Sequence, residues 1–209
     1  MMSNSIEKHA YIILYHKNSD QLIRLLKILD DPRNDIYIHA DKRSRDFPMD
    51  QLRNAVKKSG LFFTERISVH WGSFSIVKAT LILLKEATKK GQYAYYHLLS
   101  GQDLPIKTQD YIHTYFKENS GKEFINFLPD KCRETFVSRI KQYRFLQGLY
   151  AGRKGLIASG IQLIERASVK IQRSMKINRI RGKEKNIFFG SEWFSVTNEF
   201  AKYTIQHEK

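Results

Sequence analysis

The first forty residues alternate between short β-prone runs and an amphipathic helix, and this pattern restricts the fold more than any other feature of the chain. His9–Tyr15 and Asp35–Ala40 are short apolar runs of the kind that forms buried strands. Between them, Asp20–Leu29 carries four leucines at helical spacing, and Asn18 or Ser19 stands where a helix N-cap is expected. Strand, helix and strand within about thirty residues predict the βαβ unit of a parallel sheet.

The alternation continues along the chain. We expect further helices at Met49–Ser59, Ser75–Lys89, Asp110–Phe116 and Asn198–His207. We expect further strands at Phe62–Phe63, Ile67–Val69, Tyr93–Leu99 and Glu123–Phe127. In the helix over 75–89, the buried face is predicted to contain Val77, Leu81, Leu84 and Ala87. No Gly- or Pro-rich linker divides the 209 residues. We therefore predict one domain of the α/β class, with a mostly parallel sheet flanked by helices.

The net charge of +15 is unevenly distributed. Between Lys131 and Lys185, basic side chains outnumber acidic ones fifteen to three. We interpret 146–185 as a basic insertion, which is either a solvated helix face with a loop or a segment that touches an anionic membrane surface or a phosphorylated substrate. No zinc spacing or aromatic RNA-binding motif is present, so nucleic acid is not an expected partner.

The chain also has few features that would direct it out of the cell. Cys132 is the single cysteine, which fits a reducing compartment. The N-terminal residues lack the apolar region of a signal peptide, and no apolar run reaches the roughly 20 residues of a membrane span. The expected location is the cytoplasm, peripheral to the inner face of the membrane.

Polar side chains follow three of the predicted strands. His16 follows the first strand and Asp41 closes the second, with His39 two residues earlier on the same face. Ser100–Asp103 (SGQD) follows the strand at Tyr93–Leu99, and Gly101 within it would permit a close backbone approach or a positive φ. Ligands of parallel α/β sheets bind beyond the carboxyl ends of the strands. Asp41 is therefore either a turn aspartate or an acceptor for a ribose hydroxyl or base N–H, and Asp103 suits sugar hydroxyls.

The segment Gly190–Phe194 (GSEWF) combines a Gly-Ser turn with a carboxylate and two aromatic rings. Hydroxyl acceptors beside aromatic faces suit a carbohydrate. Glu192 and Trp193 are therefore candidate sugar-binding residues.

Four motifs together carry a resemblance to a known family. The chain resembles the core-2/I-branching β-1,6-N-acetylglucosaminyltransferases, a family that also contains peptide O-xylosyltransferases, at Ile38–Lys42 (IHADK), His70–Val77 (HWGSFSIV), Tyr95–Thr108 (YYHLLSGQDLPIKT) and Gly190–Phe194. The resemblance implies a GT-A-like (Rossmann-like) fold and an inverting transfer of N-acetylglucosamine from a UDP-sugar to a hydroxyl of a glycan, such as a surface or capsular polysaccharide. UDP-xylose is the alternative donor.

The resemblance also assigns roles to residues. Asp41, with His16 and His39, would contact the nucleotide, and Ser100, Gly101 and Asp103 would contact the donor sugar. Arg139, Glu192 and Trp193 would face the acceptor. Where many nucleotide-sugar transferases have Asp-x-Asp, this chain has Gly101-Gln102-Asp103. One carboxylate is a poor Mg²⁺ or Mn²⁺ site, so no metal or other cofactor is expected.

The resemblance places the catalytic base roughly thirty residues after GSEWF, in an Asp-Glu-x-x-Trp-like segment that would lie beyond Lys209. We therefore expect a chain that is truncated at its C-terminus and inactive or nearly so by itself. Eukaryotic members of the family carry an N-terminal membrane helix, which is not found in this sequence, so the resemblance implies a bacterial-type member. The alternative from another class is a catalytically dead module that binds a glycan or an anion.

Overall fold

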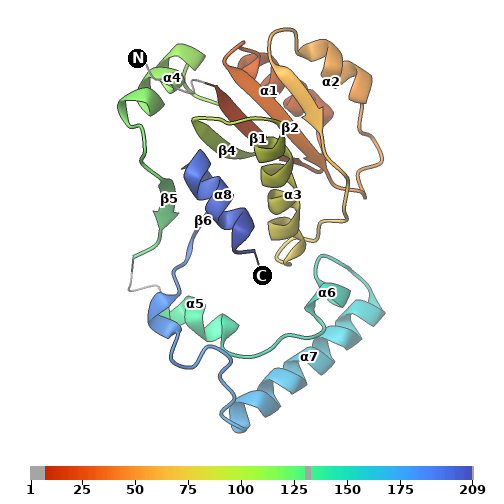
Figure 1. Ribbon diagram of the computed structural model, residues 1–209. Helices are drawn as coiled ribbons and strands as arrows, with labels where there is room; N and C mark the ends of the chain where they lie inside the picture. The colour runs from red at the N-terminus through yellow and green to blue at the C-terminus, as the bar shows by residue number, and fades with distance from the viewer. Residues whose placement is uncertain (1–7, 130–132, 209) are drawn as a thin grey trace. The chain divides into compact units, whose positions relative to one another are not determined.

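The computed structural model describes residues 8–129 and 133–208 (Figure 1). Lys131, Cys132 and Lys209 lie outside the described residues. The chain divides into two compact units. The sheet unit comprises Met1–Val69, Val77–Ile125 and Glu192–Lys209, and the helical unit comprises His70–Ile76 and Asn126–Ser191.

A six-stranded sheet has the order β3-β2-β1-β4-β6-β5. The strands, in chain order from β1 to β6, are His9–Tyr15, Asn34–Ala40, Gly60–Phe63, Tyr95–Ser100, Phe124–Phe127 and Gly190–Thr197. Strand β1 pairs in parallel with both β2 and β4, β2 pairs in parallel with β3, and β4 pairs antiparallel with β6. The predicted α/β class with a mostly parallel sheet is therefore confirmed.

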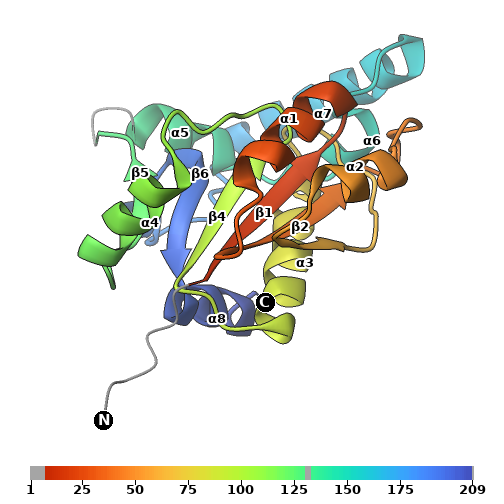
Figure 2. The same ribbon diagram turned by 90° about the horizontal axis from the view of Figure 1, so that it is seen from above.

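Helices cover both faces of this sheet (Figure 2). Helices α1 (Ser19–Leu29) and α2 (Met49–Ala55) pack on one face, where α4 (Gln109–Glu118) also places Phe116 against His97. Helices α3 (Ser75–Lys90) and α8 (Asn198–Gln206) pack on the other. Because residues alternate between faces along a strand, the odd-numbered residues of β1 face α1 and the even-numbered ones face α3.

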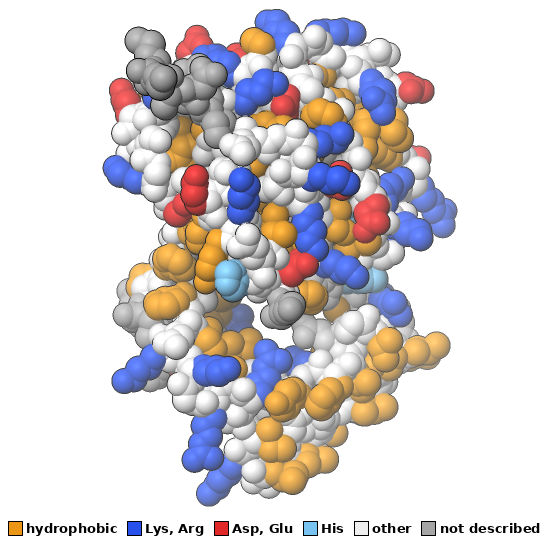
Figure 3. Space-filling model, in the orientation of Figure 1, with side chains coloured by type: hydrophobic (Ala, Val, Ile, Leu, Met, Phe, Trp, Pro, Cys, Tyr) orange, Lys and Arg blue, Asp and Glu red, His pale blue; other side chains and the backbone are white. Residues whose placement is uncertain are grey.

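The helical unit contains α5 (Arg133–Ile140), α6 (Gln147–Tyr150), α7 (Leu156–Ser174) and a 3₁₀ turn at Glu184–Asn186. The basic segment 146–185 lies wholly within this unit. Hydrophobic side chains are visible at the surface over α7 (Figure 3).

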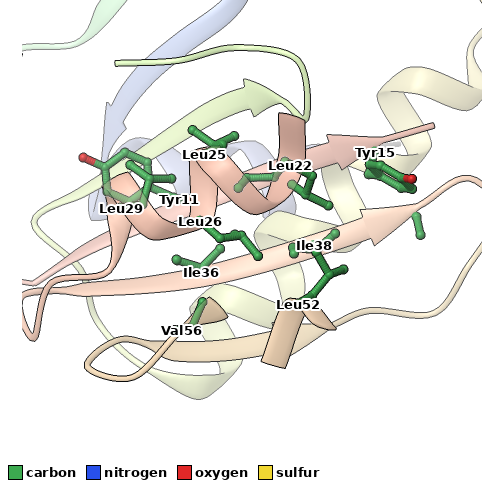
Figure 4. Packing of buried hydrophobic residues seen from close by; sticks show 12 residues of the cluster. Tyr11, Tyr15, Leu22, Leu25, Leu26, Leu29, Ile36, Ile38, Leu52 and Val56 are labelled. Carbon is green, nitrogen blue, oxygen red and sulfur yellow. The ribbon is translucent and has the colours of Figure 1, made fainter. Parts of the chain in front are cut away.

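Helix α1 forms where the sequence predicts it. Asn18 is the N-cap at φ 66°, and its side chain accepts a hydrogen bond from the backbone N–H of Gln21 at 3.2 Å, which satisfies one of the unpaired donors of the first turn. The four leucines of the helix are fully buried against β1 and β2 (Figure 4): Leu22, Leu25, Leu26 and Leu29. Burial of each such side chain stabilises the fold by about 1.5–3 kcal/mol.

Three local predictions were wrong in informative ways. Helix α2 ends at Ala55 because the carboxylate of Asp30 accepts the backbone N–H groups of residues 57–59 at 2.8–2.9 Å and draws the chain into a turn. The segment Ile67–Val69 is not a strand, since its N–H groups bond to side chains instead. In α3, Leu84 and Ala87 are buried as predicted, together with Ala79 and Leu83, whereas Val77 is exposed and Leu81 is only half-buried.

Histidines are buried where α4 covers β1 and β4. Nε2 of His97 lies 3.1 Å from Nδ1 of His9, and His9 stacks on His113 with ring centroids 4.1 Å apart. Burial, followed by the charges of His97 and His113, lowers the pKa of His9 to about 2. Burial lowers the pKa of His97 to about 3. Both rings are therefore neutral in the folded protein at every ordinary pH.

We predict that acid destabilises the protein through these rings. The unfolded chain binds protons at His9 and His97 below pH 6.5, whereas the folded chain does not. Their contribution is therefore present above pH 6.5 and is lost as the pH falls toward 3. Between pH 7 and 5 the free energy of unfolding should drop by about 4 kcal/mol from this pair, as measured by urea titration. His97→Asn should reduce the dependence, and His207→Gln, at an exposed side chain just after α8, should not. Equal stability at both pH values would contradict this account.

Candidate functional site

The carboxyl ends of three parallel strands begin the candidate site. The backbone N–H of Asp41, just after β2, donates to the carbonyl of Tyr15 in β1 at 2.8 Å. On the other side of β1, the N–H of Gly101 after β4 donates to the carbonyl of Leu14 at 2.9 Å. The loops that carry His16, Asp41 and Gly101 therefore leave the sheet side by side, at the edge where α/β proteins bind ligands.

Ser100–Asp103 forms a turn that is closed by its own side chains. The N–H of Asp103 donates to the carbonyl of Ser100 at 3.0 Å, and the N–H of Ser100 donates to Oδ2 of Asp103 at 2.7 Å. Oγ of Ser100 accepts from the N–H of Gln102 at 3.3 Å. These bonds fix the Asp103 carboxylate at the end of β4.

Strand β6 adds a tryptophan to this carboxylate. Nε1 of Trp193 donates to Oδ2 of Asp103 at 2.7 Å. The contact follows from the antiparallel register in which His97 of β4 faces Ser195 of β6. Asp103 was predicted to contact the donor sugar and Trp193 the acceptor, and the structure brings the two side chains together across 90 residues of sequence.

A cavity of about 340 Å³ lies at this pair. Its lining is mostly apolar, with Leu104, Pro105 and Phe116 beside Asp103 and Trp193. The polar members include His97, whose Nδ1 lies 2.7 Å from Oγ of Ser195. An apolar cavity with a few fixed polar groups is typical of small-ligand sites.

Tyr11, His97 and Ser195 also line this cavity, and the sequence analysis did not select them. The available signal was His97 itself, because a histidine inside the otherwise apolar run of β4 needs a polar partner. Nothing in the sequence indicated that this partner is Ser195, 98 residues away.

His16 and Gly101 are placed by their neighbours in the same edge. Nε2 of His16 lies 3.2 Å from the side-chain amide nitrogen of Gln102. Partial burial, and then the charge of Lys17, lower the pKa of His16 below its ordinary value, so the neutral ring can accept from that amide. Gly101 is buried, and a Cβ there would lie 3.1 Å from Cδ2 of Tyr15. Its φ is not positive, so the close approach explains this glycine.

The carboxylate of Asp41 is buried and is held within its own loop. The Arg43 guanidinium lies 2.8 Å from Oδ2, and the N–H groups of Arg43 and Val69 donate to Oδ1 at 2.9 and 3.3 Å. Burial would raise the pKa of Asp41, but these bonds lower it below its ordinary value. Asp41 was interpreted either as a turn aspartate or as an acceptor for a nucleotide. The structure shows the hydrogen bonds of the turn aspartate. Arg43 also donates to the carbonyl of Val69.

His39 has a similar internal bond. Its side chain is buried, and Nε2 accepts the backbone N–H of Ile67 at 3.2 Å. Burial lowers the pKa of His39, and this favours the neutral form that the bond requires. His39 and Asp41 therefore both fix the segment after β3 against the end of β2.

The remaining predicted residues lie in different units. Glu192 is exposed on β6 in the sheet unit. Arg139 belongs to α5 of the helical unit, where its guanidinium lies 5.0 Å from the ring centre of Phe136, which stacks on Phe189. The GSEWF motif begins with Gly190 because a Cβ there would lie 2.0 Å from the carbonyl oxygen of Asn126 in β5.

Across residues 8–129 and 133–208, no three His, Cys, Asp or Glu side chains are grouped so that they could hold a metal ion. Within the same residues, no helix combines the length and apolar character of a membrane span.

The sequence matches a known protein family. The family described as "Branch: Core-2/I-Branching enzyme" matches residues 9–209. The chain belongs to this family.

Two relatives illustrate its range. A human beta-1,3-galactosyl-O-glycosyl-glycoprotein beta-1,6-N-acetylglucosaminyltransferase is 26% identical over 205 residues, which cover 96% of this chain and 42% of the relative. Rat xylosyltransferase 2 is 27% identical over 219 residues, covering 99% of this chain and 22% of the relative. The chain thus spans less than half the length of these relatives. A solved structure, mouse xyloside xylosyltransferase 1, aligns with a TM-score of 0.40 at 9% identity over 96% of this chain and 70% of its own.

We predict that the Asp103 carboxylate holds the turn and the indole together. Asp103→Ala removes both bonds to Oδ2 and should lower the free energy of unfolding by about 1–3 kcal/mol. Asp103→Asn keeps one oxygen acceptor and should cost less. The measurement is urea unfolding followed by the fluorescence of Trp193 in a Trp71→Phe background, in which Asp103→Ala should also shift the emission to the red. Equal stability of the Ala and Asn variants would contradict the proposed contacts.

Proposed function

We propose that this protein is a glycosyltransferase that uses a nucleotide sugar, most simply UDP-N-acetylglucosamine. The observation that carries the proposal is the Asp103–Trp193 pair at the carboxyl end of β4, above a cavity of about 340 Å³. Membership of the Core-2/I-Branching enzyme family supports it.

The chemistry of Asp103 suits a donor sugar. The bonds from Ser100 and Trp193 both go to Oδ2, so Oδ1 is the oxygen that would accept sugar hydroxyls. A carboxylate accepts such bonds strongly because it is charged. Trp193 is half exposed, and its ring would cover an apolar sugar face.

The neighbouring loops suit the nucleotide diphosphate. Lys17 follows β1, and Lys42, Arg43 and Arg45 follow β2; all four are exposed at the strand ends. Positive charge there would attract a doubly charged diphosphate and stabilise it as a leaving group. We propose that transfer needs no metal, and that Asp41 acts by holding Arg43 in place and His16 by contacting the nucleotide.

The reaction would be an inverting displacement. A carboxylate takes the proton of an acceptor hydroxyl, and that oxygen attacks the anomeric carbon from the side opposite the diphosphate. The new C–O bond forms as the bond to the diphosphate breaks, and UDP leaves with the electron pair. We propose Glu192 and Trp193, both in the sheet unit, as contacts of a glycan acceptor, and we assign neither Asp103 nor Glu192 as the base.

UDP-xylose is the second candidate donor. Rat xylosyltransferase 2 aligns over 99% of this chain, and a Drosophila xylosyltransferase oxt is 32% identical over 118 residues, which cover 55% of this chain and 13% of the relative. Xylose lacks the N-acetyl and hydroxymethyl groups, so the two donors differ in how much apolar space they fill.

We predict that the protein binds UDP-N-acetylglucosamine, measured by isothermal titration calorimetry, with UDP-xylose, UDP and ADP-glucose as comparisons. Asp103→Asn should weaken the UDP-sugar at least tenfold, through loss of a charged hydrogen bond worth about 1.5 kcal/mol or more, and should leave UDP alone nearly unchanged. EDTA should have no effect.

Asp50→Asn, an exposed aspartate on α2, is the matched control and should bind like the parent. Tighter binding of UDP-xylose than of UDP-N-acetylglucosamine would make UDP-xylose the proposed donor. Binding of a free glycan with no affinity for any nucleotide would overturn the transferase proposal in favour of a glycan-binding module.

A further inference from the structure

Helix α7 turns its large apolar side chains outward. Leu156 is 92% exposed, Ile157 82% and Met175, just after the helix, 68%. Ile157, Ile164 and Ile171 recur every seven residues and therefore share one face. The outward apolar face consists of Leu156, Ile157, Leu163, Ile164, Ile171 and Met175, all of which are exposed. Figure 3 shows hydrophobic side chains along this part of the surface.

The inward face of α7 consists of Glu165, Val169 and Gln172, and its two polar side chains are hydrogen-bonded. Glu165 is 1% exposed, and its Oε2 accepts the N–H of Leu146 at 2.9 Å. Gln172 is also buried; its amide oxygen accepts the N–H of Tyr143 at 2.8 Å and its amide nitrogen donates to the carbonyl of Tyr143 at 3.0 Å. These bonds tie α7 to the segment 143–146 by its polar side. Packing inside the helical unit therefore does not use the apolar face.

Charge on the exposed surface of α7 has one sign. Arg166, Lys170 and Arg173 are all exposed, and their spacing of four and three residues places them on one side of the apolar face. Arg153 and Lys154 precede the helix and Lys176 follows it, all exposed. The single carboxylate of the helix is Glu165, which is buried. The exposed surface is therefore apolar and cationic.

We propose that α7 docks on an anionic lipid bilayer and lies in the plane of its interface. The outward apolar face would enter the boundary between head groups and acyl chains, and the flanking cations would pair with lipid phosphates. A helix with a wide apolar face and a basic flank has the pattern of interfacial helices. The charge pattern favours anionic lipid over a neutral surface, because each Lys or Arg near such a membrane adds to the attraction. This proposal is independent of the transferase proposal.

The experiment is flotation of the purified protein with vesicles of phosphatidylcholine alone or with 30% phosphatidylglycerol, without any sugar nucleotide. We expect recovery in the floating fraction with phosphatidylglycerol and little without it. The triple variant Arg166→Gln, Lys170→Gln, Arg173→Gln should weaken binding about a hundredfold, since each cation contributes about fivefold. The double variant Ile164→Ser, Ile171→Ser should also abolish flotation.

Matched controls come from exposed residues of the sheet unit. Ile106→Ser, at a side chain that is 92% exposed, controls for loss of an apolar group. Lys27→Gln, Lys89→Gln, Lys202→Gln controls for loss of three exposed cations. Both should float like the parent, and circular dichroism should show that every variant is folded.

A second readout keeps the isoleucines and the cations of α7 in place. Leu156→Trp in a background of Trp71→Phe and Trp193→Phe should shift its emission to the blue when phosphatidylglycerol vesicles are added. Equal flotation with both vesicles, or no response of either α7 variant, overturns the proposal. If the parent protein does not float but forms a dimer that Ile164→Ser, Ile171→Ser dissociates, the apolar face is a contact between copies and not a membrane contact. Binding to an acidic protein without binding to vesicles would also overturn the membrane proposal.

Discussion

The pairing of β1 with a parallel strand on each side is the constraint on which the rest of the sheet unit depends. Seven residues of β1 pair with β2 and six with β4, all in parallel. Parallel pairing forces three strands to end at one edge, and it also buries both faces of β1. The alternating residues of that strand therefore organise two separate cores, one under α1 and one under α3.

Some polar residues at that edge hold its loops together, whereas Asp103 keeps an oxygen that we propose for ligand binding. The carboxylate of Asp41 accepts hydrogen bonds from Arg43 and from the N–H of Val69. Nε2 of His39 accepts the N–H of Ile67, and these bonds fix the loops around the strand ends. Asp103 is held by Ser100 and Trp193 through one oxygen. In a site of this kind the supporting hydrogen bonds determine how well the remaining acceptor is aimed, and this is why the transferase proposal is based on Asp103.

The two units use amphipathic helices in opposite ways. Helix α1 buries its leucines against the sheet and exposes its charges. Helix α7 buries Glu165 and Gln172, which bind backbone groups, and exposes its isoleucines. The sequence pattern of the two helices is similar, so the difference lies in what each has to pack against. An exposed apolar face of this size favours a surface partner, and the cations beside it favour an anionic one.

The sequence by itself determined the elements whose local signals agree: the strands at β1, β2 and β4, the helix α1 with its Asn18 cap, and the family. It also indicated Asp103 and Trp193 separately, because each belongs to a short motif. It placed Leu84 and Ala87 correctly on the buried face of α3 but not Val77 and Leu81, since that helix is apolar on several sides and the sheet beneath it decides which of them is covered. Only the tertiary structure decided that Trp193 donates to Asp103 and that His97 meets Ser195, because these contacts depend on strand order and register, which no local pattern of residues encodes.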